Sequence, residues 1–138
     1  MCFRRLEKHK VADKPITCYK VMNVYLNDDS NFELESLIYP CGKRYRIGDV
    51  MRPLQPIRVE AIDEMGYVFG GVIHSYGLKA IKRQDERGDI IGIRVCVKCE
   101  IPKGEVYWYR KHCDTYISKS LVIKSIMGHD DCVQEMVS

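Results

Sequence analysis

The sequence predicts an α+β fold, with a single mostly antiparallel, twisted sheet of about six to seven short strands and one main helix. Short runs rich in β-branched and aromatic residues recur along the chain, separated by clusters of Gly, Pro, Asn and Asp. Only one segment has the apolar side, the capping residue and the following glycine that are typical of a helix. Strands joined by short turns pair antiparallel, so one mixed layer packed by one helix is expected.

The strands are predicted from composition and from the alternation of apolar and polar residues. The clearest is 90–101 (IIGIRVCVKCEI), whose period of two is typical of a half-buried strand. The other predicted strands are 16–25, 32–39, 57–62, 67–73, 105–109 and 116–127. Residues 45–56 are predicted to be a winding connection, because Gly48 and two prolines disfavour a central strand there.

The single helix is predicted directly after Ser75, in the segment YGLKAIKRQDERG (76–88). Leu78, Ala80 and Ile81 give this segment an apolar side, and its final glycine can end the helix. Serine is common at helix N-caps, so capping is the simplest role for Ser75.

Length and composition indicate one globular domain. A chain of 138 residues is of single-domain size and buries about two-thirds of its unfolded surface. Apolar residues make up 46% and charged residues 30%, which excludes the disordered class. We expect one domain at 15–127 between a basic N-terminal tail (1–14) and an acidic C-terminal tail (128–138). The net charge of +3 leaves a nucleic-acid face open without indicating one.

The number of cysteines and the lack of long apolar stretches indicate the cellular compartment in which we expect the protein. No stretch approaches the roughly 20 apolar residues that span a bilayer, and residues 1–14 lack the apolar middle of a signal peptide. Seven cysteines are an odd number, which fits reduced thiols better than a disulfide framework. We therefore expect a protein of the bacterial host cytoplasm with no membrane partner.

Two groups of residues have metal-binding chemistry. Cys96 and Cys99 have the spacing of zinc and redox motifs, but on a strand they would face opposite sides of the sheet, and no second pair completes the site. His112, Cys113 and Asp114 are adjacent, and they could close a metal site only together with residues from another element. We expect no metal and no cofactor, with the strand cysteines acting as small apolar residues.

Several other segments contain residue types that ligand-binding and catalytic motifs use. The pair Gly70-Gly71 leads neither to a phosphate loop nor to a dinucleotide fingerprint, and Ser75 lacks nucleophile-elbow spacing. A single-stranded nucleic-acid platform would use aromatic residues beside basic ones, but ordinary strands produce the same string. That string consists of Tyr107, Trp108, Tyr109 and Tyr116, beside Arg110, Lys111 and Lys119.

The junction between the Gly-Gly strand and the helix is the best candidate for a small-molecule site. Glycines let a ligand approach the backbone, and the first helical turn offers unpaired N–H groups to an anion. His74 and Tyr76 could stack on, or hydrogen-bond, a base or a ribose. The candidate ligand-binding residues are Gly70, Gly71, His74, Ser75, Tyr76, Asp114 and Tyr116. A bend and a helix cap would explain the same residues without a ligand.

The end of the chain resembles a group of small phage, prophage and gut-bacterial proteins. The resemblance rests on CEIPKGEVY (99–107) and YISKSLVIKSI (116–126), which match a C-x-I-P-K-G-x-x-Y segment followed by a final strand. It covers about residues 16–127 and implies a mobile-element origin without an assigned activity. GVIHS (71–75), followed by the helix, more weakly resembles the ADP-ribosyltransferase fold. Thr115 stands where that family has its catalytic glutamate, so the resemblance does not imply transferase activity.

These observations predict a non-enzymatic phage or mobile-element protein that binds a host macromolecule or a small nucleotide-like ligand. Two alternatives remain open. One is a degenerate ADP-ribosyltransferase-like or nucleotide-processing enzyme, with a cleft near His74, Ser75, Tyr76 and Asp114. The other is a structural or assembly protein that forms a homo-oligomer through its oppositely charged tails.

Overall fold

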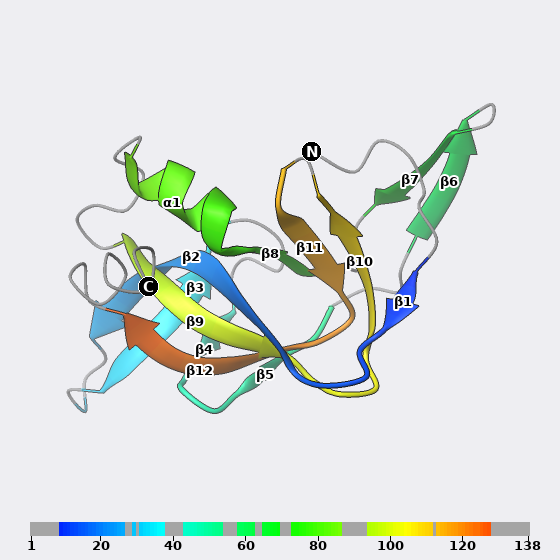
Figure 1. Cartoon of the computed structure of the whole chain (residues 1–138). Coiled ribbons are helices and arrows are strands. Elements are labelled where there is room, and N and C mark those ends of the chain that lie inside the picture. The colour runs from blue at the N-terminus through cyan, green and yellow to red at the C-terminus, as the bar shows by residue number, and fades with distance from the viewer. Residues whose placement is uncertain are drawn as a thin grey trace.

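The chain in this computed structural model consists largely of β-strands (Figure 1). The structure describes residues 9–26, 29, 31–37, 43–53, 58–62, 65–69, 73–86, 94–111 and 113–127. Within these residues, strands form a ten-stranded antiparallel sheet and a separate two-stranded sheet, and one helix lies against the large sheet.

The large sheet runs in the order β1-β10-β11-β8-β2-β9-β12-β5, with β3 pairing with β2 and with β4. Its strands are β1 (Lys10–Val11), β2 (Ile16–Leu26), β3 (Phe32–Ser36), β4 (Arg44–Tyr45), β5 (Val50–Met51), β8 (Ile73–Tyr76), β9 (Arg94–Ile101), β10 (Val106–Arg110), β11 (Thr115–Ser118) and β12 (Leu121–Met127). The separate pair consists of β6 (Arg58–Ile62) and β7 (Met65–Phe69), and the helix is α1 (Leu78–Glu86).

The predicted α+β class with six to seven strands is wrong, because the described fold is all-β. The helix buries little more than Ala80 and Ile81, whereas the strands supply the rest of the buried core. Three strands of the large sheet are only two residues long, too short to show an alternation in the sequence. The predicted strand 116–127 is two strands, β11 and β12, separated by a turn in which the Ser118 hydroxyl donates to the Ser120 carbonyl at 2.9 Å.

The sheet curls round at one end, because β4 pairs with β3 while β5 pairs with β12. A turn at residues 46–49 joins β4 to β5, and Gly48 in it has a φ of 92°, which favours glycine. The Gly48 N–H donates to the Ile123 carbonyl at 2.8 Å, and the Ile123 N–H donates to the Asp49 carbonyl at 2.9 Å. The larger core cluster lies inside this curl and contains Cys18, Met22, Leu34, Tyr45, Met51, Val97, Cys99, Leu121 and Ile123, among others.

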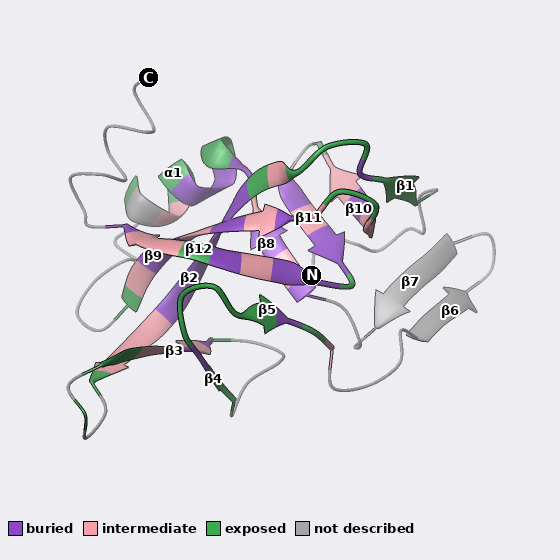
Figure 2. Cartoon of the chain, turned by 90° about the horizontal axis from the view of Figure 1, so that it is seen from below, coloured by how far each residue is buried: buried purple, intermediate pink, exposed green. Residues whose placement is uncertain are grey.

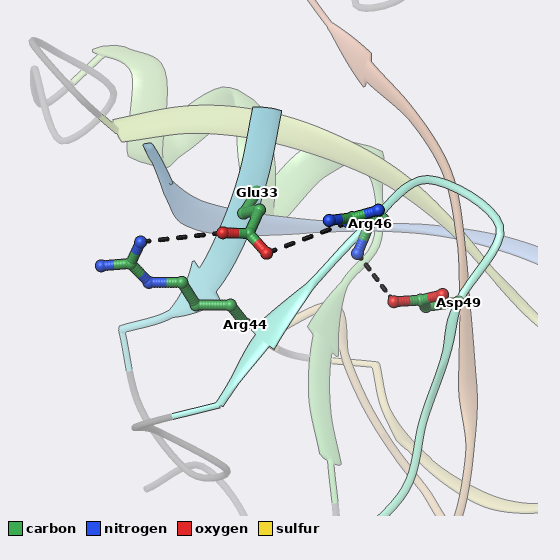
Figure 3. Close-up of polar contacts among 4 residues, drawn as sticks. All are labelled: Glu33, Arg44, Arg46 and Asp49. Carbon is green, nitrogen blue, oxygen red and sulfur yellow. Dashed lines mark hydrogen bonds and ion pairs between the residues drawn. The ribbon is translucent and has the colours of Figure 1, made fainter. Parts of the chain in front are cut away.

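Charged side chains cover the outside of the same corner (Figure 3). Glu33 on β3 forms ion pairs with Arg44 at 3.8 Å and with Arg46 at 3.9 Å, and the Arg46 N–H donates to Asp49 at 2.8 Å. The Arg44 guanidinium also lies 4.3 Å from the centre of the Tyr25 ring. Both arginines are about half exposed, and exposed ion pairs stabilise a fold only weakly.

The helix covers the other face of the central strands (Figure 2). A second core cluster there contains Tyr19, Val21, Ile81, Cys96 and Met127, with Tyr76 packed against it. Cys96 therefore lies under the helix, whereas Cys99 belongs to the larger cluster on the opposite face. This confirms the expectation that the Cys-x-x-Cys pair is divided between the two sides of its strand.

Part of the segment predicted as a basic tail is packed on the sheet. Residues 10–11 form β1, which pairs with β10, and Ala12 is 2% exposed. The Ala12 N–H donates to the Glu105 carbonyl at 3.0 Å, and the Gly104 N–H donates to the Ala12 carbonyl at 2.7 Å. The predicted acidic tail, 128–138, lies outside the described residues. The helix in the described part of the chain is too short and too polar to span a membrane.

Candidate functional site

Four side chains form a line across four neighbouring strands, on the face that carries the larger core cluster. The line, here called the polar row, consists of Tyr109 on β10, Tyr116 on β11, Ser75 on β8 and Lys20 on β2. Tyr109 lies opposite Tyr116, and Tyr116 lies opposite Ser75. Because Tyr19 pairs with Tyr76, the next position along β2 brings Lys20 beside Ser75. The tyrosines are half-buried, whereas Ser75 is 0% and Lys20 only 3% exposed.

Tyrosine rings gather at the accessible end of the polar row. The ring centres of Tyr109 and Tyr116 are 4.5 Å apart, and Tyr107 lies 6.1 Å from Tyr116. Burial, with the nearby Asp114 charge, raises the pKa of Tyr116 to about 12. Trp108 alternates to the opposite face, where it is buried against His9. The aromatic string of the sequence is therefore divided, and three of its tyrosines share one surface, called here the tyrosine face.

Asp114 connects the tyrosine face to the start of the helix. Its carboxylate accepts hydrogen bonds from the Ala80 N–H at 3.1 Å and from the Tyr109 hydroxyl at 2.6 Å. Its carbonyl accepts from the Gly77 N–H at 2.8 Å. The hydrogen bond to Asp114 raises the pKa of Tyr109 well above its usual value. Asp114 therefore caps helix α1 from the turn that precedes β11, and it holds Tyr109 in place.

The residue directly before the helix is Gly77, because the capping Asp114 carboxylate occupies the space that a side chain there would need. The Gly77 carbonyl accepts the first helical hydrogen bond, from the Ile81 N–H at 3.1 Å. A Cβ atom at Gly77 would overlap the Asp114 carboxylate. Asp114 itself has a φ of 49°, a conformation that Asp tolerates better than most residues. The suggestion that Ser75 caps the helix is wrong, because Ser75 lies within β8, and the anion position at the helix start is already occupied by Asp114.

Lys20 lies at the buried end of the polar row. Its ammonium donates to the His74 carbonyl at 2.7 Å, which is its one hydrogen-bond acceptor among the described residues. Burial lowers the pKa of Lys20 from 10.5 to about 8. Cys18 and Cys99 face each other across β2 and β9 nearby, and burial raises the pKa of the Cys18 thiol to about 12 and that of Cys99 further. Both thiols are therefore protonated at neutral pH and give Lys20 no counter-charge.

Ser75 is the second buried polar group in this region. Among the described residues, its hydroxyl approaches only the Cys18 thiol, and it forms no well-aligned hydrogen bond there. It lies close enough to the Cys18 thiol to favour ionisation of that thiol slightly, against the much larger effect of burial. A buried hydroxyl and a buried ammonium thus lie side by side with few partners.

The residues predicted for the ligand site are only partly brought together. Ser75 and Tyr116 share one face, and Asp114 lies at the start of β11 beside them. His74 and Tyr76 alternate to the opposite face, where Tyr76 packs in the cluster under the helix. Burial, and then the charge of Lys20, lowers the pKa of His74 to about 4. Gly70 and Gly71 lie outside the described residues.

Sequence reasoning missed Lys20 as a site residue and did not count Tyr109 among the ligand-binding residues. The signal for Lys20 was its place in the apolar run ITCYKVMNVY, where alternation puts it on the same side as Cys18 and Met22. No comparable signal links Asp114 to Ala80, because the bond joins segments 34 residues apart in the chain.

The sequence contains histidines and cysteines that could in principle bind a metal ion, so their positions in the structure matter. Within the described ranges, no three His, Cys, Asp or Glu side chains gather into a group able to hold an ion. The Cys113 thiol instead donates to the Arg110 carbonyl at 3.8 Å, and His112 lies outside those ranges.

Comparisons with known proteins do not identify the chain. No protein-family model, no curated protein and no solved structure matches it. The resemblances to phage proteins and to ADP-ribosyltransferases stay predictions, and function has to be argued from the site.

Proposed function

We propose that this protein is a non-enzymatic binding protein for a small nucleotide-like ligand, whose base stacks on the tyrosine face. The observation that carries the proposal is the convergence of Tyr107, Tyr109 and Tyr116 from two strands onto one half-buried surface. Bases stack on such rings whatever their identity, and each stacked base contributes about 1–3 kcal/mol.

The tyrosine face is held in a fixed arrangement, which favours binding. The Asp114 carboxylate fixes the Tyr109 hydroxyl, and the Tyr116 ring packs against the core. Rings that are already ordered lose less side-chain entropy when a ligand binds, so more of the stacking energy appears as affinity.

The environment of the candidate catalytic groups supports binding rather than catalysis. The one carboxylate of the predicted site, Asp114, is engaged by two hydrogen-bond donors and caps a helix. Ser75 is fully buried, and the His74 side chain lies on the opposite face of β8. A nucleophile and its base need to be within hydrogen-bond reach of each other, and these two side chains point apart.

Titration calorimetry with adenosine tests the proposal. Adenosine binds the wild-type protein, and Tyr116→Leu weakens binding by about 5- to 150-fold, the range that corresponds to one lost stacking contact of about 1–3 kcal/mol. Tyr116→Phe keeps the ring and retains most of the affinity.

Tyr25→Leu is the matched control, since Tyr25 is another half-buried tyrosine but lies beside Arg44, away from the tyrosine face. This variant keeps wild-type affinity. The proposal fails if the wild type binds no adenosine, or if Tyr116→Leu and Tyr25→Leu lose affinity equally.

A further inference from the structure

The polar row ends in two buried polar groups that have few partners. Lys20 is 3% exposed and uses one of its three N–H donors, on the His74 carbonyl. Ser75 is 0% exposed, and the described residues offer its hydroxyl only the Cys18 thiol, a weak hydrogen-bonding group. The two lie on the same face of adjacent strands, with Tyr116 next in the line.

Burying an ammonium and a hydroxyl with few partners lowers the stability of the fold unless a further group binds to them. A buried ammonium needs a counter-charge or gives up its proton, and a buried hydroxyl without a partner costs about 1–3 kcal/mol. The two neighbours whose negative charge could compensate the ammonium, Cys18 and Cys99, are protonated thiols. A bound anion would meet both needs, because its oxygens accept from the ammonium and from the hydroxyl.

We propose that Lys20 and Ser75 form a phosphate-binding end of the ligand site, so that a nucleotide stacks its base on the tyrosine face and directs its phosphate along the polar row. This inference rests on the proposed function for the base. Lysine binds phosphate as a point charge on a flexible four-carbon stem, which lets the ammonium turn toward Tyr116 when an anion arrives.

The N-terminus of helix α1 is not an alternative binding position for this phosphate. Its N–H groups would attract an anion, but the Asp114 carboxylate already accepts from the Ala80 N–H there. A second negative group at that position would be repelled by Asp114. Lys20, the one cation of the polar row, is therefore the group that would hold the phosphate.

Comparing adenosine with adenosine monophosphate separates the two ends of the site. Both bind the wild-type protein, and the monophosphate binds at least tenfold more tightly. Lys20→Met removes this difference and leaves adenosine affinity unchanged. Met has a similar length and suits a buried position, so the variant is expected to fold.

Ser75→Ala provides a second variant that keeps the charge. It weakens binding of the monophosphate several-fold and leaves adenosine binding unchanged, because only the phosphate contacts the hydroxyl. If Lys20→Met does not fold, Ser75→Ala decides: unchanged monophosphate affinity overturns the inference.

The outcomes distinguish this inference from the proposed function. If adenosine binds but the monophosphate binds no more tightly, or if the difference survives Lys20→Met, the phosphate end is wrong and base stacking stands. If neither nucleoside nor nucleotide binds, the proposed function fails. Inorganic phosphate then tests the anion site alone: a rise in the melting temperature of the wild type, absent in Lys20→Met or Ser75→Ala, supports it, and no rise overturns it.

Discussion

Asp114 and Lys20 are both charged and buried in the same sheet, yet their surroundings differ sharply. The Asp114 carboxylate receives hydrogen bonds from a helix N–H and a tyrosine hydroxyl, and is 8% exposed. Lys20, 3% exposed, has a single carbonyl acceptor and two protonated thiols nearby. Buried polar groups are normally satisfied. The satisfied carboxylate therefore has a structural role, and the poorly satisfied ammonium is the group at which we propose that a phosphate binds.

Removing the satisfied charge has the largest expected effect on stability. Asp114→Ala deletes the helix cap and the partner of the Tyr109 hydroxyl, so the free energy of unfolding falls by about 2–3 kcal/mol. Urea unfolding at neutral pH measures the loss. A loss below about 0.5 kcal/mol, the range of ordinary surface substitutions, would contradict a structural role.

Gly77→Ala is the matched control for this cap. In the wild-type background its Cβ overlaps the Asp114 carboxylate, so the variant is clearly destabilised. In the Asp114→Ala background the overlap is gone, and the same substitution costs much less. Equal costs in the two backgrounds would show that the glycine is not there for the carboxylate.

A partly exposed pair of ion pairs at the surface has the smallest expected effect. Glu33→Gln removes both ion pairs with Arg44 and Arg46 at the outer corner (Figure 3). Exposed pairs contribute about 0.2–1 kcal/mol in the most favourable cases, so the free energy of unfolding changes by less than about 1 kcal/mol. Urea unfolding measures this too, and a loss as large as that of Asp114→Ala would remove the contrast between satisfied buried charges and solvated ones.

The sequence predicted most of the longer strands but not how they assemble. The β-branched run at 16–25 is β2, and 105–109 corresponds closely to β10. Two-residue strands carry no periodicity, so the sequence predicts a connection where β4 and β5 lie. Their pairing with β3 and β12 curls the sheet and forms the core within it, which leaves the helix a minor role and makes the fold all-β.

The candidate site was predicted only in part, because its residues meet through strand pairing. Tyr116 and Ser75, both among the predicted ligand-binding residues, lie opposite each other on β11 and β8, but His74 and Tyr76 alternate to the other face. Local patterns report which side of a strand a residue takes relative to its neighbours. They do not report that the Asp114 carboxylate reaches a helix N–H 34 residues away in the chain.

Titration of Lys20 by NMR tests the central claim most directly. Its side-chain Cε signal, assigned by its loss in Lys20→Met, is followed against pH in the protein without ligand. We expect a midpoint near pH 8, lowered by burial from the ordinary 10.5. Because the folded state then binds fewer protons than the unfolded state between these values, Lys20 makes the fold more stable as pH rises from about 8 to 10.5. A midpoint at or above the ordinary value would mean that a counter-charge already satisfies the ammonium, and would contradict the account.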